Sequence, residues 1–438
     1  MPCHSIKEYS ALYEESAKNS IYRSVPLLEE EWKIVSDSSG YLPEENSVTV
    51  TTGISQLRTR TLEIFEHIHL SDDIRYKKGF ILNAGISIWA IDFVPKQAKD
   101  HTQYLAIGGY NTTKEHYMID EDTQTDKRYN VVQLWSFSSS PEQMKQNPKL
   151  EMCILHEYGA ISDLKWAPFN AYDEKKLGIA AVLFVDGSIR ILVVPHPKFM
   201  HGQEKTVKET MFLKLEASRL LLNMPKMKAS CIAWGGYGRL AYGTTSGSVV
   251  VWDILGSLLQ DKPKIIASIP RVSQLPIRCI SWSSLFNENL LLTSDLDGNI
   301  LVHDLSDPFM TYKVFRRRTA FTCISGTGHN SGFLFSEADG MVRRNFGYDT
   351  KKSLNLTAHN GHVWAISVSP HHGIMASVSS NGNAMVKMFA SDEVELTGRH
   401  KNLEYTLYRL MFDNDTQTFR YVDGIKPSVR HFCFLFCL

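Results

Sequence analysis

Two groups of arginines are the residues of this chain whose type and spacing best suit a chemical role. Arg316, Arg317 and Arg318 are consecutive, and Arg343 and Arg344 form a pair further along the chain. Guanidinium groups bind phosphate oxygens in pairs of hydrogen bonds, and such contacts weaken as salt is added. The arginines therefore predict contact with nucleic acid or with an acidic partner strand. The alternative is a solvated face.

Histidines and cysteines could bind a metal ion, but their spacing forms no ligand set. His359, His362, His371 and His372 come without a Cys-x-x-Cys pair or a group of carboxylates. We expect His362 to be a structural histidine and the last two to lie in a loop. The seven cysteines are an odd number spread along the chain, which predicts buried free thiols in a reducing compartment. We expect no metal site.

The sequence lacks the residue patterns that common enzyme classes require. The glycine-rich stretch 326–332 does not end in Gly-Lys-Ser/Thr, and it joins two predicted strands rather than a strand and a helix. Neither Gly-x-Ser-x-Gly nor His-Glu-x-x-His is present. We expect a protein that is not an enzyme, with no cofactor and no small-molecule substrate.

The elements that would position these residues recur as a polar turn with a glycine, followed by alternating apolar residues. Asp-Gly and Asn-Gly favour tight hairpins because glycine has no Cβ to clash at positive φ. Successive turn glycines, Gly187, Gly247, Gly298, Gly340 and Gly382, are 60, 51, 42 and 42 residues apart. A repeat near 40–45 residues with four short strands each predicts an all-β WD-repeat β-propeller. One blade cannot bury both of its faces, so the blades must stack into a ring.

The composition divides the chain into two parts. Residues 1–75 are predicted to form an acidic, partly helical extension, with helices at 26–35 and 56–70 and a strand at 47–52. Residues 76–438 are predicted to form the propeller. Six blades follow from the repeat. A seventh is expected from the last strands, closed by a strand near 47–52 or 76–83, which would remove the open edge.

Charge and hydropathy narrow the class of partners. The formal net charge is zero, so the overall charge does not by itself imply nucleic-acid binding. No apolar run approaches the ~18 residues of a membrane helix, and the first residues lack the apolar stretch of a secretory signal. We expect an intracellular protein without a membrane contact.

The second blade carries a narrower resemblance. Its segments 155–168 and 177–197 include the turn at 156–159, an Asp-Leu-Lys-Trp run at 163–166 and the sequence Pro195-His196-Pro197. This blade resembles the corresponding blade of the WD-repeat subunit of TFIIIC, the general transcription factor of RNA polymerase III. Residues 231–254 are similar to the next blade of that family. The short acidic extension differs from the long basic arm of many members.

This resemblance implies a non-enzymatic scaffold subunit in the nucleus. By that resemblance, the chain would bind other TFIIIC subunits, especially a second propeller subunit, and promoter DNA as part of the complex. It would support recognition of the internal promoter of tRNA genes and transcription initiation by RNA polymerase III. Pro195, His196 and Pro197 begin a connection where family insertions would contact a neighbouring subunit. Trp32 would either cap the ring or bind a partner groove.

The alternative is another kind of WD-repeat adaptor, such as a ubiquitin-ligase substrate receptor or a histone-tail reader. Ligase receptors usually carry Trp-Asp-x-Arg at the end of a blade. Here the sequence is Trp252-Asp253-Ile254-Leu255, which counts against that class.

Overall fold

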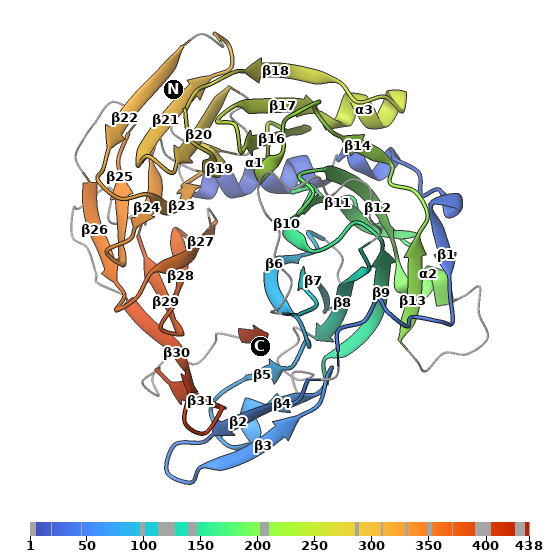
Figure 1. Cartoon of the computed structure of the whole chain (residues 1–438), viewed down its shortest axis with the longest axis vertical. Coiled ribbons are helices and arrows are strands. Elements are labelled where there is room, and N and C mark those ends of the chain that lie inside the picture. Colours follow the sequence, from blue (N-terminus) through green and yellow to red (C-terminus); the bar gives the residue numbers. More distant parts are fainter. Residues whose placement is uncertain are drawn as a thin grey trace.

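The computed structural model describes most of the chain. The described residues are 6–18, 20–44, 46–96, 101–112, 128–138, 147–201, 210–284, 289–307, 310–328, 332–347, 353–369, 371–389, 404–424 and 434–437. Within them, seven β-sheets surround a central axis (Figure 1). The predicted all-β WD-repeat propeller is confirmed.

The first strand of each blade lies nearest the axis, and the others follow outward. Blade 1 holds β6 (Ser87–Phe93), β7 (Thr102–Tyr110), β8 (Asn130–Ser138) and β9 (Lys149–His156), then β13 (Met211–Leu215) and β1 (Trp32–Ile34). Blade 2 holds β10 (Ile161–Trp166), β11 (Lys176–Phe184), β12 (Ile189–Pro195) and β14 (Leu220–Leu222), and blade 3 holds β15 (Ala229–Gly235), β16 (Arg239–Thr244), β17 (Val249–Asp253) and β18 (Ile265–Ile269).

The next three blades repeat this order. Blade 4 holds β19 (Ile277–Trp282), β20 (Leu290–Asp295), β21 (Asn299–Asp304) and β22 (Thr311–Arg316), and blade 5 holds β23 (Phe321–Gly326), β24 (Phe333–Glu337), β25 (Met341–Asn345) and β26 (Ser353–Ala358). Blade 6 holds β27 (Val363–Ser369), β28 (Ile374–Ser379), β29 (Asn383–Met388) and β30 (Glu404–Asp413). The helices are α1 (Ile6–Lys18), α2 (Pro197–His201) and α3 (Ile254–Gln260), with 3₁₀ turns η1 (Ile21–Ser24), η2 (Glu29–Glu31) and η3 (Leu70–Asp72).

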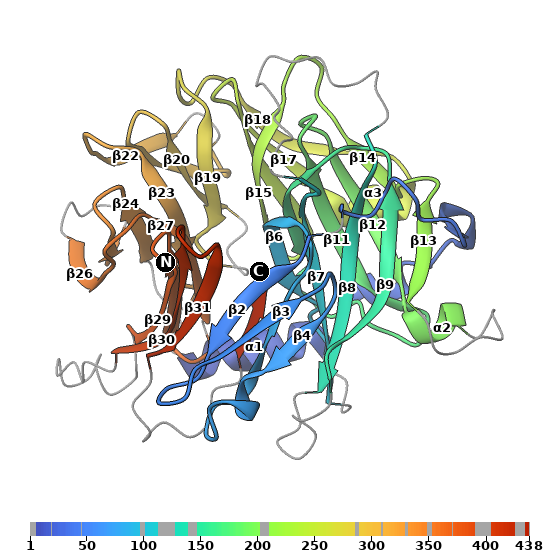
Figure 2. The same ribbon diagram turned by 60° about the horizontal axis from the view of Figure 1, so that its bottom comes forward.

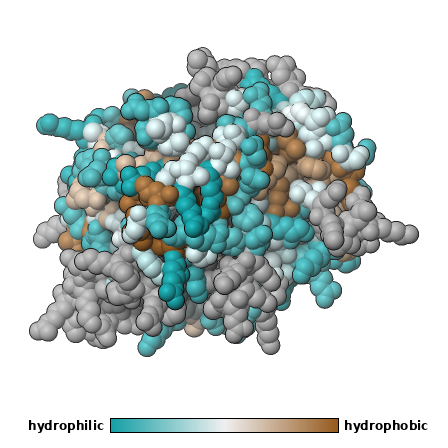
Figure 3. Space-filling model, turned by 90° about the horizontal axis from the view of Figure 1, so that it is seen from below, coloured by the Kyte–Doolittle hydropathy of each residue, from teal (hydrophilic) through white to brown (hydrophobic). Residues whose placement is uncertain are grey.

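The ring closes through strands from both ends of the chain, which we call the closing region. Strand β30 continues into β31 (Thr418–Asp423), which pairs in parallel with β2 (Val48–Thr52) and through it with β3 (Arg58–Leu62). Beside them, β4 (His67–His69) and β5 (Gly79–Leu82) form a second sheet with β32 (Phe434–Cys437) (Figure 2). The strand expected at 47–52 is thus β2. From outside, this part of the ring is mainly hydrophilic, with smaller apolar areas (Figure 3).

A buried ion pair ties the two chain ends together in the closing region. Lys77 Nζ lies 2.7 Å from Asp423 Oδ1 and donates to Leu407 O at 2.9 Å. Strands β2 and β4 come before residue 75, yet they pair with β31 and β5, which follow it. The domain boundary after residue 75 stays a prediction.

Both predicted helices of the extension are wrong. Residues 29–31 form a single 3₁₀ turn, and Trp32 then enters β1, where the strand pairs with β13 and the indole is buried. Residues 56–70 form β3 and β4, because the threonines that alternate along β3 bond across to threonines of β2. The helix that does form, α1, was not predicted; Tyr9, Tyr13 and Ala17 carry its four-residue spacing.

The glycine turns have the predicted geometry. All five turn glycines have φ between 75° and 81°. At Gly247, a Cβ would also overlap the backbone carbonyl of Ser273. The turns lie at one end of the ring, which we call the glycine-turn face.

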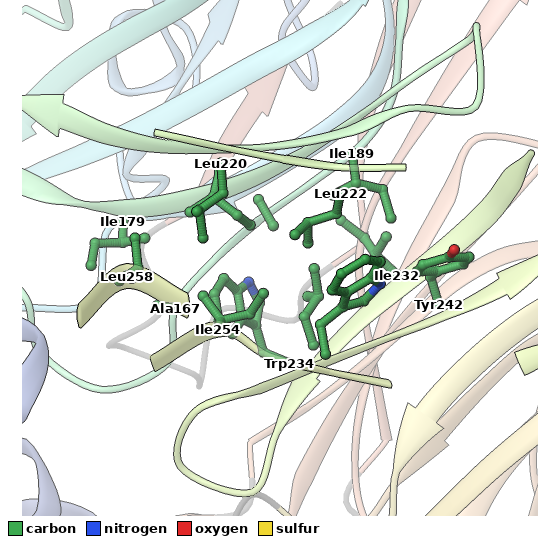
Figure 4. Packing of buried hydrophobic residues seen from close by; sticks show 14 of the residues in the cluster. Ala167, Ile179, Ile189, Leu220, Leu222, Ile232, Trp234, Tyr242, Ile254 and Leu258 are labelled. Carbon is green, nitrogen blue, oxygen red and sulfur yellow. The ribbon is translucent and has the colours of Figure 1, made fainter. Parts of the chain in front are cut away.

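Tryptophans at the ends of three inner strands link consecutive blades. Trp166, Trp234 and Trp282 each donate from Nε1 to a carbonyl of the preceding blade's inner strand: Asp92 at 3.3 Å, Lys165 at 2.9 Å and Ala233 at 3.0 Å. We call blades 1–4, joined in this way, the tryptophan-linked arc. Figure 4 shows Trp234 packed among apolar side chains of blades 2 and 3. When the N–H of a buried indole is hydrogen-bonded, the bond fixes the orientation of the ring, in addition to the apolar surface that the ring buries.

Thiols make a second set of links near the start of the inner strands. Cys231 and Cys323 are buried, and Cys279 is partly buried. The sulfurs of Cys231, Cys279 and Cys323 lie 3.8, 3.3 and 3.9 Å from carbonyls of Ile277, Thr322 and Val363 in the following blades. Burial raises the pKa of all three thiols. The prediction of buried free thiols is confirmed for Cys153, Cys231 and Cys323, and Cys279 is a free thiol that is partly buried.

Candidate interaction surfaces

The arginine triplet lies on the glycine-turn face, between blades 4 and 5. Arg317 N donates to the turn carbonyl of Gly298 at 2.8 Å, which fixes the triplet beside that turn. Arg316 Nη2 lies 2.8 Å from Asp297 Oδ1, and Arg317 Nε lies 3.3 Å from Glu337 Oε1. Arg318 is exposed and has no ion pair with any described residue. The structure therefore gathers the three cations at the surface, two of them beside carboxylates.

The arginine pair points in two directions, as strand alternation requires. Arg343 contacts Glu337 at 3.3 Å and also pairs with Asp339, and the hydrogen bond with Asp339 raises the pKa of Arg343. Arg344 is 4% exposed. Its Nη1 donates to Phe389 O at 2.8 Å, and its guanidinium stacks on the Phe346 ring.

The two groups meet at one carboxylate. Glu337 contacts both Arg317 and Arg343. Burial raises the pKa of Glu337, and the two arginines lower it. A phosphate at this point would have to compete with Glu337, Asp297 and Asp339 for the guanidiniums. Contact with nucleic acid or an acidic partner through these arginines stays a prediction, and the burial of Arg344 favours a structural role for that residue.

The residues predicted to contact a neighbouring subunit pack inside the chain. Trp32 is 7% exposed and lies in the core between blades 1 and 2. His196 is 4% exposed, with Nε2 3.0 Å from Tyr172 Oη and its ring against Tyr104. Pro195 and Pro197 are also buried. Their part in a partner contact stays a prediction. In this structure Pro195, His196 and Pro197 join β12 of blade 2 to helix α2.

The structural histidine of blade 6 is His359, not His362. His359 is 5% exposed and its Nε2 lies 2.8 Å from Ser377 Oγ, whereas His362 is exposed. Burial lowers the pKa of His359. His303 has the same role in blade 4, between Thr293 and Thr311, and burial lowers its pKa to about 4. No group of three or more His, Cys, Asp or Glu among the described residues is arranged to hold a metal ion.

Helix α1 covers the opposite end of the ring, which we call the helix-covered face. This face carries loop residues between the first and second strands of blades 2, 3 and 6. Tyr13 Oη donates to Pro168 O of blade 2 at 2.6 Å, and Ser16 Oγ lies 3.0 Å from Tyr237 Oη of blade 3. Ser10 Oγ lies 3.1 Å from His371 Nδ1 of blade 6. The helix thus spans the ring (Figure 1). No helix of the described residues is long and apolar enough to cross a membrane.

The fold places the chain among WD-repeat propellers. The family described as WD domain, G-beta repeat matches residues 350–386. The resemblance to TFIIIC subunits is confirmed. The chain is 25% identical over 373 residues to "Transcription factor tau subunit sfc6" of Schizosaccharomyces pombe, covering 81% of this chain and 57% of the relative.

Two further relatives match more weakly. The chain is 22% identical over 342 residues to "General transcription factor 3C polypeptide 2" of Homo sapiens, covering 68% of this chain and 37% of the relative. It is 30% identical over 176 residues to "Meiotic fizzy-related protein 1" of Schizosaccharomyces pombe, covering 39% of this chain and 38% of the relative. The chain therefore spans about half, or less, of the length of these relatives.

Proposed function

We propose that this chain is a non-enzymatic scaffold subunit of a TFIIIC complex in the nucleus. The observation that carries this proposal is the similarity to a TFIIIC subunit along 81% of the chain. The linked blades support it, because a preformed surface lowers the ordering cost of association. In this role the chain would help the complex to recognise the internal promoter of tRNA genes and to start transcription by RNA polymerase III. A second propeller subunit would be its main partner.

Affinity purification tests the assembly. The tagged chain is expected to recover the other TFIIIC subunits from nuclear extract, identified by mass spectrometry, and a tagged fluorescent version should accumulate in the nucleus. Recovery of a cullin adaptor in place of TFIIIC subunits would contradict the proposal and favour the alternative adaptor function.

Charge reversal of the arginine triplet tests the DNA contact. Replacing Arg316, Arg317 and Arg318 with glutamate is expected to weaken promoter binding by the assembled complex and to reduce its dependence on salt. Lys262→Glu is the control, because this exposed lysine lies at the rim of blade 3. An unchanged salt dependence in the triple variant would remove these arginines from the DNA site while leaving the scaffold role intact.

One observation favours an adaptor as the second candidate. The match to a fizzy-related protein is 30% identical, although it covers 39% of this chain. Against the ligase-receptor form, Asp253 caps helix α3 by accepting from Gly256 N at 2.8 Å, and Ile254 is fully buried. The position at which such receptors carry arginine is Leu255, in the first turn of that helix.

A further inference from the structure

Helix α1 packs on the ring as an intramolecular ligand. Its thirteen residues cross the helix-covered face and contact loops of blades 2, 3 and 6. Its inward side follows a four-residue spacing, with Tyr9 and Ala17 each 1% exposed and Tyr13 half-buried between them. Its outward side carries the exposed Glu14 and Glu15. The face therefore binds an amphipathic helix.

Aromatic rings and hydroxyls make the contact. The Tyr13 ring centroid lies 4.8 Å from that of His371 and 6.0 Å from that of Phe169. The Tyr9 and His371 rings are 5.8 Å apart. Tyr13 joins these rings to blade 2 through its bond to Pro168 O. Tyrosines at i and i+4 are thus the part of the ligand that the face recognises.

The helix does not fill the surface on which it lies. A cavity of about 430 Å³ remains beside it, lined mainly by apolar side chains that include Leu12, Ile21, Phe169, Tyr237 and Leu255. Ile21 and Tyr237 are 49% and 44% exposed.

A second cavity lies under Tyr9. Its volume is about 220 Å³, and Trp234 and Trp282 are among the residues that line it. Isolated helices of this length are marginal in water, so the packing must hold α1 in place. A helix with larger apolar side chains would bury surface that α1 leaves open.

We propose that the helix-covered face is a docking surface for an amphipathic helix of a partner protein, which α1 occupies in the free chain. The partner helix would carry aromatic residues at i and i+4 and a bulky apolar residue in place of Ser16, facing the larger cavity. Helix α1 is tethered, which gives it a high effective concentration. The partner must therefore gain affinity from the unfilled cavity. This inference does not depend on which complex the chain joins.

The direct test offers the chain its own helix as a separate peptide. A fluorescent peptide of residues 5–19 is titrated against the full chain and against the full chain carrying Tyr13→Ala, which loosens the tethered helix. We expect the variant to bind at least tenfold more tightly than the unaltered chain, since its surface is free. A peptide that itself carries Tyr13→Ala is the matched control and should not bind. Equal binding by both chains, or no binding by a variant in which α1 exchanges faster while β10 keeps its hydrogen-exchange protection, would overturn the proposal.

A second peptide separates a docking surface from a fixed cap, and it uses the unaltered chain. The peptide carrying Ser16→Leu should bind more tightly than the native peptide, because the new side chain enters the cavity. At saturation it should displace α1, which hydrogen exchange would report as faster exchange in residues 6–18 with no change in β10. Unchanged exchange in α1 at high peptide concentration would show a permanent cap and contradict the proposal. Neither result bears on the recovery of TFIIIC subunits, so the two proposals can fail separately.

Discussion

Phe93 in blade 1 and Trp234 in blade 3 hold the same position in their inner strands but lie in opposite environments. In both strands the register shifts early, and each aromatic residue comes three residues after that shift. Trp234 is 7% exposed, whereas Phe93 is 46% exposed. The residues two places earlier repeat the contrast, with Ile232 at 4% and Ile91 at 44%.

The difference shows that the neighbouring blade decides burial at this position. Trp234 packs against blade 2 and bonds to Lys165 O. Blade 1 instead faces the closing region, where Phe65 and Leu82 cover the outer part of the sheet around Trp135. These residues do not cover Ile91 and Phe93, whose side chains stay about half exposed to solvent. The ring is therefore tightly joined along the tryptophan-linked arc and more open at the inner side of its closure.

Truncating Trp234 and Phe93 should lower the free energy of unfolding by unequal amounts. Trp234→Ala should lower the free energy of unfolding by about 3–5 kcal/mol, because it leaves a cavity in the core and an unpaired carbonyl. Phe93→Ala should cost about 1 kcal/mol or less, since much of its ring already contacts water. Urea denaturation measures both. Similar losses would mean that the closure is as tightly packed as the arc.

Adding a side chain where two blades of the tryptophan-linked arc pack together should cause the next largest loss of stability. A methyl group at Gly235 would overlap the Trp282 ring, so Gly235→Ala should cost about 1–3 kcal/mol. Gly178→Ala is the control, because its methyl group would lie 3.1 Å from the edge of Trp166 and needs only a small shift. A tolerated Gly235→Ala would show that the blades can separate slightly at this link.

The pH dependence of stability probes the first link of the arc, where Asp92 accepts from Trp166 N at 2.8 Å. Burial raises the pKa of Asp92 to about 6, with the neighbouring Lys165 lowering it. The unfolded chain releases this proton near pH 4, so the folded chain binds more protons between about pH 4 and 6. Stability should therefore fall as the pH rises through this window. Asp92→Asn should remove this loss, about 2–3 kcal/mol by pH 7. An unchanged pH profile would place the titration elsewhere.

The smallest expected effect isolates the indole hydrogen bond. Trp234→Phe keeps most of the apolar contact but loses the 2.9 Å bond to Lys165 O, which should cost about 1–2 kcal/mol. Phe93→Trp, its counterpart in blade 1, should change stability by less than about 0.5 kcal/mol. Thermal unfolding compares the two. A clear gain from Phe93→Trp would show that a carbonyl is within reach at the closure.

Much of the ring could be predicted from local sequence. The glycine turns, the alternating strands and the buried thiols depend on residues close in the chain, and the structure has them where expected. The two helices predicted in the extension are wrong, because β1 and β3 gain their partners from β13 and β2. Helix α1 was missed for a related reason. The side of the helix that carries Tyr9, Tyr13 and Ala17 packs against loops at residues 168, 237 and 371, and those loops are far away in the sequence.

The candidate surfaces divide in the same way. The sequence identified the arginines but not the carboxylates beside them, because Asp297, Glu337 and Asp339 meet the guanidiniums across a hairpin and between blades. It also treated Trp32 and Pro195–Pro197 alike as contact residues, whereas packing between blades buries all four.

By itself, the sequence determined the repeat, the turns and the resemblance to TFIIIC subunits, because each of these depends on residue order within one blade. The tertiary structure alone decided which end of the ring α1 covers, how the two chain ends close it, and that Phe93 is half exposed where Trp234 is buried. These features depend on which blades are neighbours. Closure of the whole ring decides which blades are neighbours, and no local sequence pattern does.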